Sequence, residues 1–194
     1  MEIALFGGSF DPPHAGHLLA ATYLLATEPL DELWLTPVFE HPLGKKLAES
    51  FEQRVRLLER MVSDAGLLRT RVSQIERELG GEGRTVDLLE HLHRTRPGDT
   101  FALVLGSDLA AERPQWKQFD RIEELARIVS LQRGGFEAQH QARSGGVVLP
   151  RVSSTEVRAL LASGGDAQKL VPRGVLDEIA RSGLYGSSAG KRGA

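Results

Sequence analysis

The sequence predicts an α/β protein with a doubly wound parallel sheet, folded as a single domain. Short strand-like runs alternate with longer segments of helical period, which favours right-handed crossovers between parallel strands. Several of the short runs are almost continuously apolar, as expected of strands covered on both faces. The length of 194 residues lies within the range of one domain with a substantial core.

Each expected strand is a run of five or six residues that contains Val, Ile, Leu or Phe. The expected strands cover residues 2–6, 32–36, 68–73, 100–105, 126–131 and 146–150. The expected helices repeat apolar residues at i, i+3, i+4 and i+7, the spacing of one helical face. They cover residues 17–27, 51–62 and 85–94, begin again at Ser153, and end with a terminal helix within 170–186.

The remaining segments are rich in Gly, Ser and polar residues. Residues 133–146 are expected to form a surface loop, and residues 187–194 a disordered C-terminal tail. The folded domain is therefore expected to span residues 1–186.

The composition excludes several classes of protein. A net charge of −2 gives no overall positive field, so neither a nucleic acid nor a membrane is expected as a partner. The absence of cysteine excludes disulfides, thiolate metal sites and a cysteine nucleophile. The N-terminus lacks the pattern of a signal peptide, and no apolar run approaches the roughly 20 residues of a membrane span. A cytoplasmic location is expected.

The segment GGSFDPPHAGH, residues 7–17, follows the first strand and leads into a helix. Gly7 and Gly8 allow the backbone to pass close to a ligand, and the helix N-terminus offers free N–H groups to an anion. His14 and His17 are spaced to face the same way, with Gly16 between them. Neither the Walker A pattern nor G-x-G-x-x-G is present, so this is a different kind of phosphate site.

Two other interpretations of the histidine pair were open on spacing alone. A histidine in the first helical turn is often an exposed residue or a cap. The other possibility is that the two histidines bind a metal ion, although zinc-binding helices favour an i, i+4 spacing with a glutamate between the histidines. The position after a glycine-rich strand end favours phosphate binding.

A second polar cluster opens the helix that begins near Ser153. Ser153 and Glu156 fit a capping box, which accounts for those two residues. Thr155 and Arg158 are not explained by it, and a cation near a helix N-terminus is unfavourable unless an anion is present. These side chains predict a site for a triphosphate.

Together the two motifs resemble the H-x-G-H nucleotidylyltransferase superfamily, whose motif is shared with the class I aminoacyl-tRNA synthetases. The form G-G-[ST]-F-[DN]-P resembles that of the nicotinate mononucleotide adenylyltransferases, and residues 152–158 are similar to their I-S-S-T-x-[IV]-R motif. Phosphopantetheine adenylyltransferases carry a different serine-rich version. The resemblance covers residues 2–186 and implies a Rossmann-like nucleotidylyltransferase fold.

The resemblance implies transfer of AMP from ATP to nicotinate mononucleotide, giving deamido-NAD and pyrophosphate. It implies Mg²⁺ held mainly by the ATP phosphates, without a protein metal site. The catalytic residues it implies are His14, His17, Lys45 and Arg158. The ATP-binding residues it implies are Gly7, Gly8, Ser9, Phe10, His14, Gly16, His17, Gly106, Asp108, Ser153, Ser154, Thr155 and Arg158. The pyridine-nucleotide-binding residues it implies are Ser9, Phe10, Lys45, Lys46, Thr85, Trp116 and Arg133.

The chain departs from the family pattern at two places. Leu88 replaces the second threonine of the T-x-D-T-L segment, and residues 41–46 replace the usual P-P-H-K. Which of Lys45 and Lys46 acts, and whether the acid or the amide form of the mononucleotide is preferred, is therefore open, as is the oligomeric state. The alternatives are an adenylyltransferase for nicotinamide mononucleotide or phosphopantetheine, and a catalytically silent nucleotide-binding regulator on the same fold.

Overall fold

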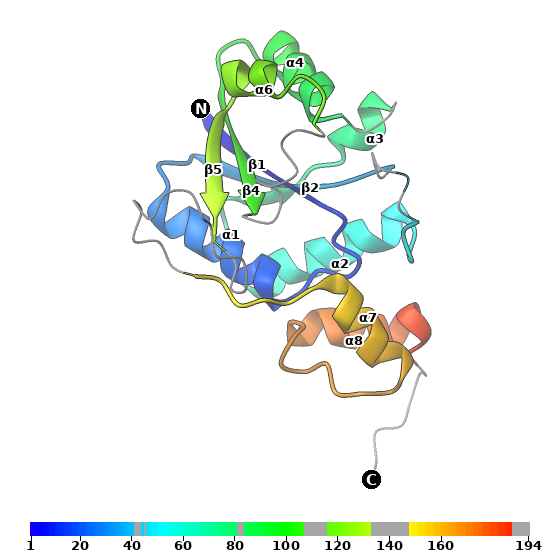
Figure 1. Cartoon of the computed structure of the whole chain (residues 1–194). Coiled ribbons are helices and arrows are strands. Elements are labelled where there is room, and N and C mark those ends of the chain that lie inside the picture. The colour runs from blue at the N-terminus through cyan, green and yellow to red at the C-terminus, as the bar shows by residue number, and fades with distance from the viewer. Residues whose placement is uncertain (41–43, 45, 81–83, 107–115, 133–147, 188–194) are drawn as a thin grey trace.

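The computed structural model describes residues 1–40, 44, 46–80, 84–106, 116–132 and 148–187. Within these residues five parallel strands form one sheet in the order β3-β2-β1-β4-β5 (Figure 1). The strands are β1 (Glu2–Gly8), β2 (Glu32–Pro37), β3 (Thr70–Val72), β4 (Thr100–Gly106) and β5 (Arg127–Leu131). The predicted doubly wound parallel sheet is confirmed.

The sixth predicted strand, residues 146–150, is wrong in its described part. Residues 146 and 147 lie outside the described residues, and residues 148–150 contain one isolated bridge, at Leu149. The Leu149 N–H donates to the carbonyl of Gln132, just beyond β5. The chain touches the sheet edge at this single point and then continues to the next helix, so Leu149 is buried, Val148 stays 57% exposed and no ladder forms.

The helices and one 3₁₀ turn follow the predicted alternation. They are α1 (Ala15–Thr27), α2 (Phe51–Asp64), α3 (Ile75–Leu79), α4 (Thr85–Thr95), α6 (Phe119–Leu125), α7 (Ser154–Ala162), α8 (Arg173–Ser182) and the 3₁₀ helix η2 (Leu184–Gly186). Ser50 caps α2, where its side chain accepts a hydrogen bond from the Gln53 N–H. Ser153 caps α7 in the same way, through the Glu156 N–H.

The sheet separates two apolar layers, because alternate residues of each strand point to opposite faces. Ala4 and Phe6 of β1 belong to the layer covered by α1, α2, α7 and α8. Ile3 and Leu5 belong to the layer covered by α3, α4 and α6. Figure 1 shows these two groups of helices on either side of the sheet.

The strand order places a topological switch between β1 and β4. From β1 the chain runs outward to β2 and β3, then returns to β4 and β5 on the other side. In open α/β sheets the ligand crevice lies at such a switch, beyond the carboxyl ends of the strands. Among the described residues, no helix is both long and apolar enough to cross a membrane.

Candidate active site

The turn from β1 into α1 holds the two predicted histidines together. His14 is the N-cap of α1 and His17 lies in its first turn, and their side chains are 3% and 7% exposed. Their rings stack with centroids 3.7 Å apart. The His14 N–H donates to Nδ1 of His17 at 3.2 Å, so a neutral His17 ring carries its proton on Nε2. The other ring nitrogen of a neutral His17 is therefore a hydrogen-bond donor.

Aromatic rings fix His17 from the protein side. Phe10 meets the His17 ring edge-on at a centroid distance of 4.7 Å, and Phe6 meets it at 6.1 Å. Phe10 has a φ of +46°, a left-handed conformation that few non-glycine residues adopt. A Cβ on Gly8 would lie 3.2 Å from the Phe10 ring, so Gly8 makes room for it. Because the whole Phe10 residue is completely buried, it supports His17 from within the protein.

Gly16 makes room for the His14 ring. A Cβ at this position would lie 3.1 Å from Cε1 and Nδ1 of His14, closer than nearly all real Cβ contacts. The family resemblance implies that Gly16 is an ATP-binding residue. In the structure its lack of a side chain lets the two imidazoles stack.

Gly16→Ala is expected to separate turnover from stability. Alanine is the better helix former by up to about 1 kcal/mol, so the free energy of unfolding should not fall. The displaced His14 ring should lower turnover about 10-fold, because small misplacements of catalytic groups are costly. Steady-state kinetics and urea unfolding of the same preparation measure both quantities, and unchanged turnover would contradict this account of Gly16.

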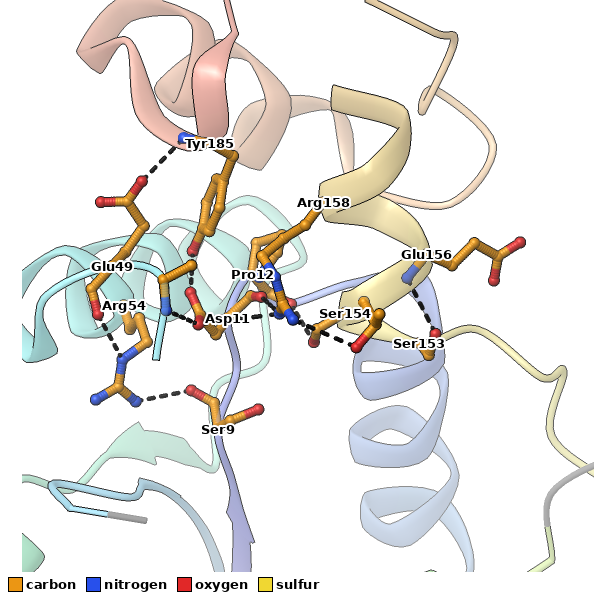
Figure 2. A network of polar contacts seen from close by, with 12 residues as sticks. Ser9, Asp11, Pro12, Glu49, Arg54, Ser153, Ser154, Glu156, Arg158 and Tyr185 are labelled. Carbon is orange, nitrogen blue, oxygen red and sulfur yellow. Dashed lines mark hydrogen bonds and ion pairs between the residues drawn. The ribbon is translucent and has the colours of Figure 1, made fainter. Parts of the chain in front are cut away.

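The start of α7 closes onto the β1–α1 turn, as Figure 2 shows. The Ser154 hydroxyl donates to the Pro12 carbonyl at 3.0 Å. Arg158 donates from one NH group to the Asp11 carbonyl at 2.5 Å and from the other to Thr155 Oγ1 at 3.3 Å. The two predicted motifs, far apart in the chain, thus meet at one place. The guanidinium retains further N–H groups for an anion.

Asp11 lies inside this turn and has no role in the sequence interpretation. Its side chain is only 2% exposed. One carboxylate oxygen accepts from the Tyr185 hydroxyl at 2.8 Å and the other from the Ala48 N–H at 2.6 Å. Arg158 lies 3.9 Å from the second oxygen. Asp11, within this short motif, therefore contacts three residues that are distant in the chain: Ala48, Arg158 and Tyr185.

Arg54 is a second residue that sequence reasoning missed. It is completely buried on α2 and donates to the carbonyls of Ser9 and Val38 at 2.7 and 2.8 Å, and to that of Glu49 at 3.4 Å. Burial lowers the pKa of Arg54, and the nearby carboxylate of Asp11 opposes that effect. The sequence feature that could have identified Arg54 is its position three residues after Phe51, on the apolar face of α2.

Glu76, on α3, lies against the segment that follows β2. One of its carboxylate oxygens accepts from the Phe39 N–H at 3.2 Å. Burial raises the pKa of Glu76 to about 7, against the opposing effects of that hydrogen bond and of the Arg54 charge. This carboxyl group therefore titrates close to neutral pH.

Glu76 is expected to make stability fall as pH rises towards 8. An unfolded glutamate has a pKa of about 4.3, so between about pH 4.3 and 7 the folded chain binds more protons than the unfolded one. The stabilisation that this extra proton provides is complete below about pH 4.3 and is lost as the pH rises through about 7. Glu76→Gln should gain stability relative to the wild type as the pH rises from 5 to 7, and should keep that gain at pH 8.

Urea unfolding at pH 5, 6, 7 and 8 measures the difference between the two profiles. Glu78→Gln is the matched control, because Glu78 is an exposed residue on the same helix. Parallel pH profiles for the wild type and Glu76→Gln would contradict the prediction.

The residues expected to bind the pyridine ring lie on the other side of the sheet. Thr85 is the first residue of α4, after Arg84 at the N-cap, and is half-buried. Trp116 packs against the apolar layer of α4 and α6, with its ring edge-on to Phe119. Leu88, which replaces a family threonine, is buried in that layer. The predicted ATP and pyridine subsites thus flank the carboxyl edge of the sheet.

Other predicted site residues divide into described and undescribed positions. Gly106 is buried at the end of β4, Gly7 and Ser9 lie at the end of β1, and Lys46 is exposed. Lys45, Asp108 and Arg133 lie outside the described residues, as do all of the predicted loop 133–146 and all of the predicted tail 187–194 except Ser187. Within the described part of the chain, no three His, Asp or Glu side chains cluster in a way that could hold a metal ion.

Comparison with known proteins places the chain in a family. A family model described as cytidylyltransferase-like matches residues 5–160. A probable nicotinate-nucleotide adenylyltransferase from Myxococcus xanthus is 44% identical over 187 residues, which cover 96% of this chain and 95% of the relative. The chain belongs to the nicotinate-nucleotide adenylyltransferase family. A member from Geobacillus kaustophilus is 36% identical over 97% of this chain and 88% of its own length.

Solved structures support the fold of this nicotinate-nucleotide adenylyltransferase family member. The nicotinic acid mononucleotide adenylyltransferase of Plasmodium falciparum, complexed with NaAD, superposes with a TM-score of 0.81. The match covers 97% of this chain and 99% of that one, at 20% identity. At this identity the likeness establishes the Rossmann-like fold alone.

Proposed function

We propose that this chain transfers AMP from ATP to nicotinate mononucleotide, releasing pyrophosphate and forming deamido-NAD. Membership of the family makes it a nucleotidyltransferase enzyme. The observation that carries the proposal is the stacked His14–His17 pair at the start of α1, with Arg158 of α7 bound to Asp11 in the turn that leads into this helix. This places hydrogen-bond donors and a cation at one helix N-terminus, as a phosphate requires.

The reaction needs little covalent work from the protein. An oxygen of the mononucleotide phosphate attacks the α-phosphorus of ATP, and the bond to the bridging oxygen of the β-phosphate breaks. The attacking phosphate is already ionised at neutral pH, so no general base has to remove a proton. Catalysis then consists of alignment and of stabilising the charge that develops as pyrophosphate leaves.

Each part of the site has a role in this scheme. His17 donates from Nε2 to an oxygen of the α-phosphate, beside the stacked ring of His14. Arg158, Thr155 and a lysine of the 45–46 pair hold the β- and γ-phosphates. Mg²⁺ bound to the phosphate oxygens would neutralise part of their charge, and oxygen-rich phosphates suit this ion.

The acceptor site is proposed to lie on the α4–α6 side of the carboxyl edge. Thr85 and Trp116 are positioned there by the start of α4 and by packing next to Phe119. Leu88 is the observation that favours a second candidate acceptor, because a buried leucine offers no hydrogen bond to a carboxylate. The cysteine-free composition also supports a cytoplasmic enzyme.

The deciding experiment is pyrophosphate release by the purified protein with MgATP. Nicotinate mononucleotide, nicotinamide mononucleotide and phosphopantetheine are compared in parallel. A strong preference for the nicotinate form supports the proposal. Activity with only one of the other two replaces the acceptor, and ATP binding without release for any of the three supports a regulator instead.

A further inference from the structure

A buried carboxylate beside a phosphate site requires an explanation. Asp11 is only 2% exposed and lies directly between the β1–α1 turn and Arg158. A negative charge at this place repels the anion that the site is proposed to bind, and burying it is costly unless it is paired and hydrogen-bonded. The pairs that Asp11 makes therefore indicate what it is for.

We propose that Asp11 and Tyr185 form a positioning pair that holds Arg158 and the segment after Lys46 in place to bind ATP. This inference rests on the proposed function, because it assigns these residues to the ATP side of that same site. Neither residue is proposed to touch the substrate, since the Asp11 carboxylate is engaged by Tyr185 and Ala48, and the Tyr185 hydroxyl by Asp11.

The two carboxylate oxygens of Asp11 accept hydrogen bonds from two different segments of the chain. Oδ1 accepts from the Tyr185 hydroxyl at 2.8 Å, and Oδ2 accepts from the Ala48 N–H at 2.6 Å (Figure 2). Ala48 lies two residues after Lys46, a predicted phosphate ligand. The carboxylate thus fixes the backbone that follows this lysine to the turn that carries the histidines.

Arg158 is restrained by the same residue. Its NH1 donates to the Asp11 backbone carbonyl at 2.5 Å and lies 3.9 Å from Oδ2. The Arg158 side chain is 26% exposed, so it sits at the rim of the turn, between buried Asp11 and solvent. The negative charge of Asp11 therefore keeps this cation beside the helix N-terminus before a ligand arrives.

Tyr185 is held firmly enough to act as the anchor. It lies in η2 with a φ of +56°, and its N–H donates to Glu49 Oε1 at 2.9 Å. Glu49 is the neighbour of Ala48, so Tyr185 holds this segment both directly and through Asp11. The turn that ends α8 is in this way linked to the candidate active site.

Tyr185→Phe tests the pair, because it removes the hydroxyl and keeps the ring that packs in the core. A hydrogen bond to a charged group is lost, and Arg158 and the segment at Lys46 lose part of their restraint. We expect about 10-fold weaker binding of a non-hydrolysable ATP analogue and a similar rise in the KM for MgATP. The KM for nicotinate mononucleotide should rise less, by no more than about 2-fold, since Thr85 and Trp116, its proposed ring contacts, lie on the other side of the sheet and only part of its predicted site is near the pair.

Tyr23→Phe is the matched control, because Tyr23 is a half-buried tyrosine on α1 that packs against the same apolar layer. It should leave both ligands' parameters unchanged. If Tyr185→Phe only lowers the stability to unfolding, or raises both KM values equally, the positioning role is refuted.

The analogue-binding comparison does not depend on turnover. If the wild type binds the ATP analogue but releases no pyrophosphate, the proposed function is refuted. The analogue affinities of the wild type and of Tyr185→Phe still test the pair in that case. An active wild type with an unaffected Tyr185→Phe variant refutes the pair alone.

Discussion

His17→Ala is expected to lower turnover by at least about 100-fold, the usual scale for losing one preorganised donor to a developing charge. The physical reason is the fixed Nε2–H, which the hydrogen bond from the His14 backbone to Nδ1 maintains. Alanine cannot replace this donor, and water in its place would have to reorganise during the reaction. Pyrophosphate release under saturating substrates measures the loss.

The control for this variant is His91→Ala, which removes a half-buried histidine on α4. Its turnover should equal that of the wild type. Circular dichroism and the unfolding midpoint check that His17→Ala still folds, because the ring also packs against Phe10. Near-normal turnover in a folded His17→Ala protein would remove His17 from the mechanism.

Arg54→Met is expected to cost about 3 kcal/mol of unfolding free energy, in the range measured when one partner of a buried polar network is removed. The side chains are similar in length, so the change mainly removes the charge and its donors. The carbonyls of Ser9 and Val38 lose the donor that the structure gives them, and Asp11 loses a nearby positive charge. Urea unfolding measures the cost.

Activity should fall with stability in the Arg54→Met protein. The two carbonyls belong to the segments after β1 and β2, so the turn that carries the histidines loses its support. Arg54→Lys should recover only part of the stability, because one ammonium group does not reproduce the planar fork of a guanidinium. Arg56→Met is the matched control, since this arginine on the same helix is 65% exposed and should cost less than about 0.5 kcal/mol. Equal costs for the two variants would contradict the role given to Arg54.

Local sequence features were enough for the five strands, for most of the helices except α3 and α6, and for two parts of the site. The alternation of short apolar runs with helical periods predicted the five described strands, because parallel strands buried on both faces are apolar throughout. Ser153 predicted the start of α7 by its capping chemistry. The spacing of His14 and His17 predicted rings that face the same way. Each of these signals acts between residues only a few positions apart.

One element was wrong, and one glycine has a contact that local sequence could not reveal. Residues 148–150 are apolar like a strand, but they meet the sheet edge at one bridge, and only Leu149 is buried. Gly16 stays a predicted ATP contact, and the structure adds that its nearest neighbour is the His14 ring. The sequence shows that a residue is apolar or small, but it does not show which atoms that residue contacts in the folded protein.

By itself, the sequence determined the fold class, the family and the place where phosphate chemistry would be found. Only the tertiary structure decided what holds that place together: the contacts of Asp11 with Ala48 and Tyr185, and of Arg54 with two strand ends. These bonds join residues up to 174 positions apart, and their value comes from burial that exists only in the folded chain. A polar side chain that supports an active site from within resembles a surface residue until the fold has covered it.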